Sequence, residues 1–227
     1  MSKWKVLTCA CSWNAVVSVA IFLVPGPALA QNTSGDYVFL IASGFLCDSS
    51  DSSACPAVVK SADDSAYELS GAGTFNPQSK SVTAVGTFTH KSLNGNSLET
   101  GIWIANQFVS FDSYGTAPGA RMQAGSAFGP PQFGPRRMHM LSAPMEVGGL
   151  AVLRIRLLPM WGPSRTAVLQ VNCALGKVPE EHQTEGIRLT LAGGGGEFDR
   201  EISGRTLFLL TRPGGSAAPM VPPPEGD

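Results

Sequence analysis

Regular alternation between apolar and hydroxyl-bearing side chains constrains this chain more than any other feature of its sequence. It is clearest between residues 81 and 90. One set comprises Val82, Ala84, Gly86 and Phe88, and the other comprises Thr83, Thr87 and Thr89, with Val85 as an apolar exception. A period of two residues is typical of a half-buried antiparallel strand. The pair Asn94-Gly95 follows, and because Asn-Gly favours a type I′ turn, we predict a hairpin here.

The next segment, residues 99–111, is longer and more apolar. Alternation places Trp103, Val109 and Phe111 on one face and Ile102, Ile104 and Phe108 on the other. The pattern therefore predicts a central strand that is apolar on both faces.

Composition and spacing extend the β pattern over the rest of the chain. The chain contains 26 Gly and 17 Pro, and in helix interiors these residues cost about 1 and about 3 kcal/mol. Further predicted strands cover residues 37–45, 56–60, 67–75, 150–158, 166–173, 186–191 and 205–211. The predicted fold class is all-β: an antiparallel meander of about eight to ten strands that forms a sandwich or a closed barrel, with one long Pro/Gly-rich loop.

The first 30 residues have the organisation of a secretory signal peptide. Two lysines precede an apolar run at residues 15–24, and Ala28-Leu29-Ala30 supplies the small residues that signal peptidase requires. The apolar run is shorter than the ~20 residues that span a bilayer, which disfavours an uncleaved anchor. We expect an exported protein, periplasmic or extracellular, with a single β-rich domain over residues 31–212 and a disordered tail over residues 213–227.

The cysteines predict a disulfide. After residue 30 they stand at positions 47, 55 and 173, and an oxidising compartment favours pairing two of them. We predict Cys47–Cys55 because a short loop is entropically easy to close. The alternative, Cys47–Cys173, would tie the first strand to a late one.

The net charge limits the classes of partner that the chain is expected to bind. The chain has 16 basic and 17 acidic residues, and removal of Lys3 and Lys5 leaves 14 basic residues. So small a net charge does not indicate binding to a nucleic acid or to an anionic membrane surface. No later segment approaches spanning length, so we expect no membrane span after signal cleavage.

Residues 116–148 interrupt the strand pattern, because their prolines do not suit a ladder. Two basic residues here, Arg136 and Arg137, have the guanidinium geometry that binds anions. The soft ligands Met138, His139 and Met140 raise the possibility of copper. Their spacing fits no tight motif and methionine commonly fills gaps under loops, so we predict no metal and no cofactor.

Catalytic candidates are few. His90 ends a strand, and Asp112 and Tyr114 are placed near the end of the next strand but one, so these three side chains suggest a His–Asp dyad at one end of the sheet. The sequence has no Gly-x-Ser-x-Gly nucleophile elbow. A histidine at a strand end is more often a polar terminus, and we favour a protein that is not an enzyme.

The interpretation we favour is therefore a non-catalytic, exported binding protein that uses a barrel mouth or a sheet face, with the 116–148 loop as a lid. Its predicted ligand is a small apolar molecule or a protein. The candidate binding residues are Trp103, Phe108, Phe111, Arg136 and Arg137. Two alternatives stay open, because fold class alone licenses no activity. One is a surface or assembly protein, and the other is a hydrolase-like or isomerase-like enzyme that uses His90, Asp112 and Tyr114.

Overall fold

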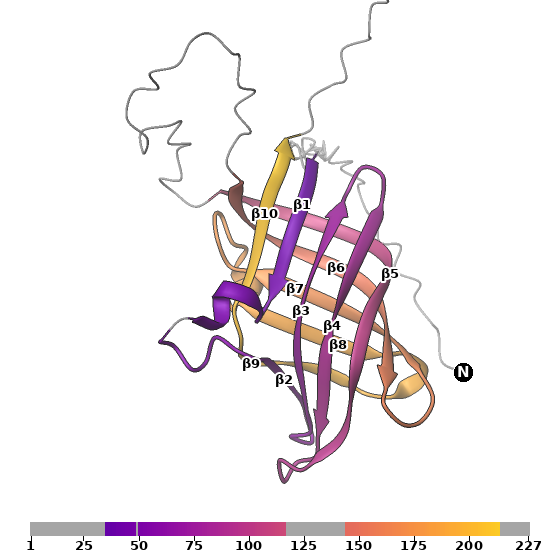
Figure 1. Cartoon of the computed structure of the whole chain (residues 1–227). Helices are drawn as coiled ribbons and strands as arrows, with labels where there is room; N and C mark the ends of the chain where they lie inside the picture. The colour runs from indigo at the N-terminus through magenta and orange to yellow at the C-terminus, as the bar shows by residue number, and fades with distance from the viewer. Residues whose placement is uncertain (1–34, 49, 117–143, 214–227) are drawn as a thin grey trace, which may run out of the picture. The chain divides into compact units, whose positions relative to one another are not determined.

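A computed structural model describes residues 35–48, 50–116 and 144–213, which form an all-β structure, as predicted (Figure 1). The strands are β1 (Gly35–Ile41), β2 (Ala57–Ser61), β3 (Ala66–Asn76), β4 (Ser81–Lys91), β5 (Ser97–Thr116), β6 (Met145–Pro159), β7 (Arg165–Cys173), β8 (Gly186–Leu191), β9 (Glu197–Ser203) and β10 (Thr206–Pro213). Short 3-10 helices are η1 (Gly44–Asp48), η2 (Glu180–His182) and η3 (Ala192–Gly194). None of the helices in the described segments has the length and apolar character needed to cross a membrane.

These strands belong to one antiparallel sheet that curves round on itself. β3, β4, β5 and β6 form a meander. The other edge of β3 pairs with β2 over residues 66–69 and with β1 over residues 71–75. The other edge of β6 pairs with β10 over residues 145–147 and with β7 over residues 149–157. Since β1 pairs with β10, and β7 connects through β8 and β9 to β2, the meander closes by two routes.

The core lies between two layers of this curved sheet. Figure 1 shows β3, β4 and β5 in front of β6, β7 and β8, which run across them. Trp103 is fully buried and its Nε1 donates a hydrogen bond to the Ser70 carbonyl at 3.1 Å. A Cβ atom at Gly71 or Gly86 would overlap the Trp103 ring, so these two glycines leave the space that the indole fills.

Strand β5 departs from strict alternation. Its register against β6 shifts near residues 106 and 109, and such a bulge inserts one extra residue into the strand. As a result, Trp103, Phe108 and Phe111 all point inward and are buried. The predicted placement of Phe108 opposite to Trp103 is therefore wrong. The other face of β5 is exposed at Ile102, although its apolar side chains are typical of a face that another layer buries.

Other boundaries differ from the sequence-based prediction. β1 ends at Ile41, and of the residues predicted to continue it, Gly44 and Phe45 belong to η1. β5 extends to Thr116 and β6 begins at Met145, so the connection between them is shorter than the predicted 116–148 loop. Strand β9 was not predicted, because Glu197-Phe-Asp-Arg-Glu201 contains a single large apolar residue, Phe198, which the structure buries.

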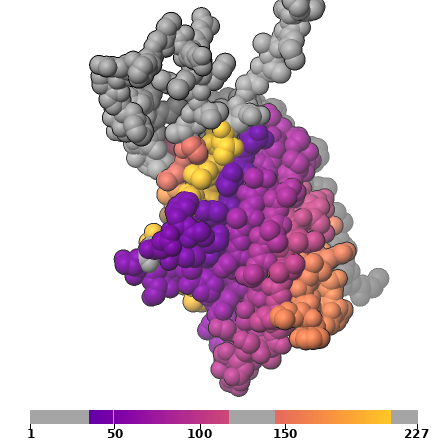
Figure 2. Space-filling model, viewed as in Figure 1, coloured from indigo at the N-terminus to yellow at the C-terminus, as the bar shows by residue number. Residues whose placement is uncertain are grey.

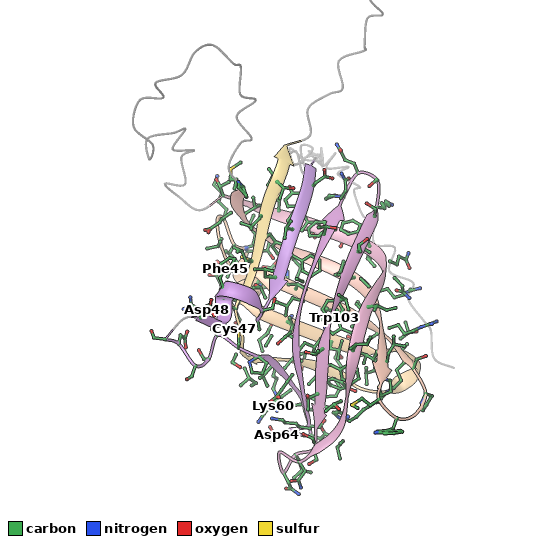
Figure 3. All side chains as sticks on the ribbon, viewed as in Figure 1. Phe45, Cys47, Asp48, Lys60, Asp64 and Trp103 are labelled. Carbon is green, nitrogen blue, oxygen red and sulfur yellow. A yellow bond between two sulfur atoms is a disulfide. The ribbon has the colours of Figure 1, made fainter. Side chains whose placement is uncertain are left out.

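The predicted disulfide Cys47–Cys55 is confirmed. Figure 3 labels Cys47 on η1 beside Asp48. The loop that the bridge closes is fixed to the β9–β10 turn, because Arg205 N donates to the Ala54 carbonyl at 2.9 Å. Cys173 is a free, buried thiol.

The predicted signal peptide, residues 1–30, lies outside the described residues, as do residues 214–227 of the predicted tail.

Candidate functional site

The outer face of β4, β5 and β6 carries an apolar surface that the fold leaves uncovered by described residues. We call it the outer patch, and it comprises Val85, Leu98, Ile102, Leu158, Met160 and Trp161. The register joins these positions: Ile102 lies opposite Leu158, and Val85 lies opposite Ile104. Ile102 lies on the outer face of β5, and Leu98 lies at the bulge opposite the step from His90 to Lys91, where it is exposed. Figure 2 shows the orange atoms of the β6–β7 connection next to the magenta atoms of β5.

Exposure distinguishes this surface from an ordinary sheet face. Nine large apolar side chains in the described segments are exposed, and five of them belong to the outer patch. Trp161 is 86 % exposed, Met160 69 %, Leu98 60 %, Val85 55 % and Ile102 47 %. Single apolar residues on a surface are ordinary, whereas a contiguous group marks an interaction site or an aggregation liability.

The turn that carries Met160 and Trp161 is held against β5. Met160 N donates to the Thr100 carbonyl at 2.9 Å, and Thr100 Oγ1 donates to Met160 Sδ at 3.5 Å. Met160 is therefore fixed beside Thr100 on β5, and Trp161 follows it in the turn.

Two arginines border the outer patch. Arg154 and Arg156 are exposed because they alternate along β6 with the buried Leu153, Ile155 and Leu157. Arg156 lies opposite Ile104 on β5. No carboxylate of the described residues forms an ion pair with either arginine, whereas Lys91, at the edge of the same face, pairs with Glu68 at 2.5 Å. The border of the patch therefore carries positive charge.

The structure places the predicted binding residues Trp103, Phe108 and Phe111 in the core, where they are 0, 4 and 7 % exposed. The ring centroids of Phe108 and Phe111 lie 5.4 and 5.0 Å from that of Phe75. These rings fill the interior between the layers. They are therefore not exposed at a barrel mouth or on a sheet face, where they were expected to bind a ligand.

His90 is not brought together with Asp112 and Tyr114. It lies opposite Glu99 on β5, and Asp112 is farther along that strand by about 40 Å at a rise of ~3.3 Å per residue. Instead, the His90 ring stacks on Tyr67, with centroids 4.4 Å apart. Burial, and then the positive charge of Arg165, lower the pKa of His90. The predicted dyad at one end of the sheet does not form.

Tyr114 belongs to a separate polar cluster. Its hydroxyl donates to Asn172 Oδ1 at 3.1 Å, and Asn172 Nδ2 donates to the carbonyls of His182 and Thr184 at 2.8 and 2.6 Å. Burial, followed by the negative charge of Asp112, raises the pKa of Tyr114 to about 12. Because the side-chain atoms of Asn172 are occupied by these bonds, the cluster fastens the β7–β8 connection to the sheet.

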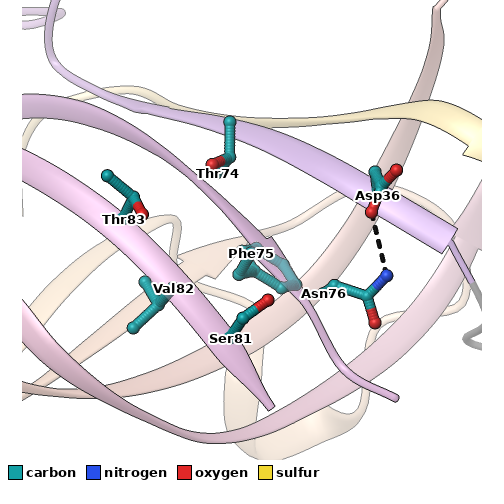
Figure 4. Close-up of a pocket in the computed structure, with 7 residues that line it drawn as sticks. All are labelled: Asp36, Thr74, Phe75, Asn76, Ser81, Val82 and Thr83. Atoms are coloured by element: carbon teal, nitrogen blue, oxygen red, sulfur yellow. Dashed lines mark hydrogen bonds between the residues drawn. The ribbon is translucent and has the colours of Figure 1, made fainter. Parts of the chain in front are cut away.

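A hollow of about 280 Å³ lies between the start of β1 and the β3–β4 turn, and Figure 4 shows the residues that line it. Its lining residues are Asp36, Thr74, Phe75, Asn76, Ser81, Val82 and Thr83. Asn76 Nδ2 donates to Asp36 Oδ1 at 2.8 Å, and Asn76 Oδ1 accepts from the backbone of Gln78 and Ser79. These polar groups already have partners within the protein, so nothing in the hollow points to a particular ligand.

The remaining predicted residues lie outside the described residues. These are Arg136, Arg137, Met138, His139 and Met140. Within the described ranges, no group of three or more His, Cys, Asp or Glu side chains is arranged to hold a metal ion. Burial raises the pKa of the Cys173 thiol to about 12, so it is a poor nucleophile.

Comparison with family models, with curated proteins and with solved structures gives no match for this chain.

The outer patch has a signal in the sequence, namely the apolar residues that alternate on the second face of residues 99–111. Ile102 and Ile104 appeared as the second apolar face of a central strand. A central strand was expected to be apolar on both faces, and nothing in the sequence showed that its outer face faces solvent.

Proposed function

We propose that this chain is an exported, non-catalytic binding protein that docks onto a partner through the outer patch. The observation that carries the proposal is the concentration of exposed apolar side chains on β4, β5 and the β6–β7 turn. Exposing such a surface to water is unfavourable, and docking removes it from water. Docking through a sheet face is also in keeping with an interior that is filled by side chains.

Export is part of this proposal. A disulfide in a chain of this kind is compatible with an oxidising compartment outside the cytoplasm. Whether the connection between β5 and β6 acts as a lid stays a prediction, because residues 117–143 lie outside the described residues.

Oxidative footprinting in the cells that produce the protein tests the proposal without requiring knowledge of the partner. Met160 and Trp161 react readily with hydroxyl radicals when exposed. We expect both to be oxidised several-fold less in intact cells than in the purified protein. Phe45 and Ile202 are 60 and 54 % exposed outside the patch and provide the internal reference. Equal oxidation of the patch in cells and in solution, relative to these references, would refute docking.

A further inference from the structure

The shape of the outer patch favours a fluid partner surface over a folded one. Its most exposed side chains, Trp161, Met160 and Leu98, project from a turn and from the start of a strand. The hollow described above is lined by none of them. A protein partner matches a patch by shape complementarity, whereas lipid acyl chains adapt to separately projecting side chains.

The residue types fit the boundary of a bilayer. Tryptophan is enriched at membrane–water interfaces because its ring is apolar and its N–H is polar. A second turn, between β4 and β5, presents Leu93 with 67 % exposure close in sequence to Leu98. The chain thus offers apolar side chains from two neighbouring turns, next to β5.

The charges at the border select the kind of lipid. Arg154 and Arg156 are exposed and have no carboxylate partner among the described residues. The outward positions in the middle of β4 and in the first half of β5 carry threonines and aliphatic residues, and Glu68, which lies opposite Thr89 on the neighbouring strand β3, is paired with Lys91. Guanidinium groups bind phosphate oxygens through two parallel hydrogen bonds. The net charge of the whole chain, −1, conceals this local positive border.

We propose that the outer patch binds the surface of an anionic phospholipid bilayer. Trp161, Met160 and Leu98 enter the interfacial region, and Arg154 and Arg156 bind the lipid phosphates. This inference rests on the proposed function, because it names the partner of the same surface.

Co-sedimentation of the protein with vesicles tests the inference. The probes are vesicles of equal parts phosphatidylglycerol and phosphatidylcholine, and vesicles of phosphatidylcholine alone. We expect tighter binding to the anionic vesicles, weakened by added salt because salt screens exposed charges. Trp161→Ala should weaken binding about tenfold or more, since it removes a large buried apolar area from the complex. Arg154→Gln together with Arg156→Gln should weaken binding to anionic vesicles about fivefold for each arginine.

Matched controls separate these effects from general ones. Ile202→Ala removes an exposed apolar side chain from β9, which is four strands away from β5 in the sheet order. Lys80→Gln together with Lys177→Gln removes two exposed positive charges away from the patch. Both controls should bind vesicles as the unaltered protein does. Circular dichroism of each variant checks that the fold is retained.

Two results would overturn the lipid inference: absence of binding to the anionic vesicles, or equal loss of binding in patch and control variants. If footprinting shows protection in cells while vesicles do not bind, docking stands and the partner is a protein. If the patch is not protected in cells either, the proposed function falls as well.

Discussion

The imidazole of His90 lies parallel to the ring of Tyr67, with 4.4 Å between the ring centroids and 4° between the ring planes. Phe198 from β9 meets both rings edge-on. This aromatic group occupies the end of the sheet at which the sequence placed a possible catalytic histidine. Packing in this group gives His90 a structural role. It also makes the stability of the folded protein depend on pH.

We expect the protein to lose stability as the pH falls below the ordinary pKa of histidine. In the folded state, burial lowers the pKa of His90 below its ordinary value of 6.5. A lowered histidine pKa means that the unfolded state binds the proton more readily, so the contribution of neutral His90 is present above pH 6.5 and is lost as the pH falls. The measurement is the denaturant midpoint between pH 8 and pH 5. His90→Phe should flatten this dependence, whereas Ile202→Ala, which removes no titratable group, should leave it unchanged. A dependence that is the same in both variants would contradict the assignment.

Two tyrosines should respond in opposite directions to loss of the hydroxyl group. Tyr67 is fully buried and its OH has no hydrogen-bond partner among the described residues, so Tyr67→Phe should raise the free energy of unfolding by about 1 kcal/mol. The Tyr114 hydroxyl donates to Asn172, so Tyr114→Phe should lower it by about 1–2 kcal/mol. Urea denaturation of the two variants measures both effects. A loss of stability in Tyr67→Phe would mean that an internal water satisfies that hydroxyl.

The disulfide should contribute measurably to stability. Cys47 and Cys55 are separated by eight residues in the sequence, and a loop of this size corresponds to roughly 2–3 kcal/mol of unfolded-state entropy. Replacement of both cysteines by serine should therefore lower the free energy of unfolding by about that amount. Guanidinium denaturation with and without reductant provides the measurement. Reductant should shift the midpoint of the unaltered protein and leave that of the double variant in place.

The sequence predicted the β-strands of the meander well because their side chains alternate and the Asn94-Gly95 turn is distinctive. It also predicted the Cys47–Cys55 disulfide, because closure of a short loop depends only on residues that are close in the sequence. It could not predict the face on which Phe108 lies, because the extra residue near position 106 reverses the side chains that follow it until the second shift, near position 109, restores the alternation. For that reason Phe108 joined Trp103 in the core.

His90 and Tyr114 show why the sequence did not predict which side chains come together in a site. Their separation depends on the register between β4 and β5, which pairs His90 with Glu99. Strand order and register arise from long-range pairing, and a single sequence does not encode them in a local pattern. The outer patch was missed because an apolar face looks the same in sequence whether another layer covers it or solvent does.

The neighbouring residues Ile102 and Trp103 test whether the outer patch is free of the rest of the chain. Ile102 is 47 % exposed on the outer face, and Trp103 is fully buried on the inner face. Ile102→Thr keeps a β-branched side chain that suits a strand, so the free energy of unfolding should change by less than about 0.5 kcal/mol. Trp103→Ala should lower it by about 3–5 kcal/mol, because it leaves a cavity beside Gly71 and Gly86. Urea denaturation of both variants measures the contrast. A cost above about 2 kcal/mol for Ile102→Thr is of the size found for buried core residues. That result would show that another part of the chain covers the patch and would remove the basis for docking.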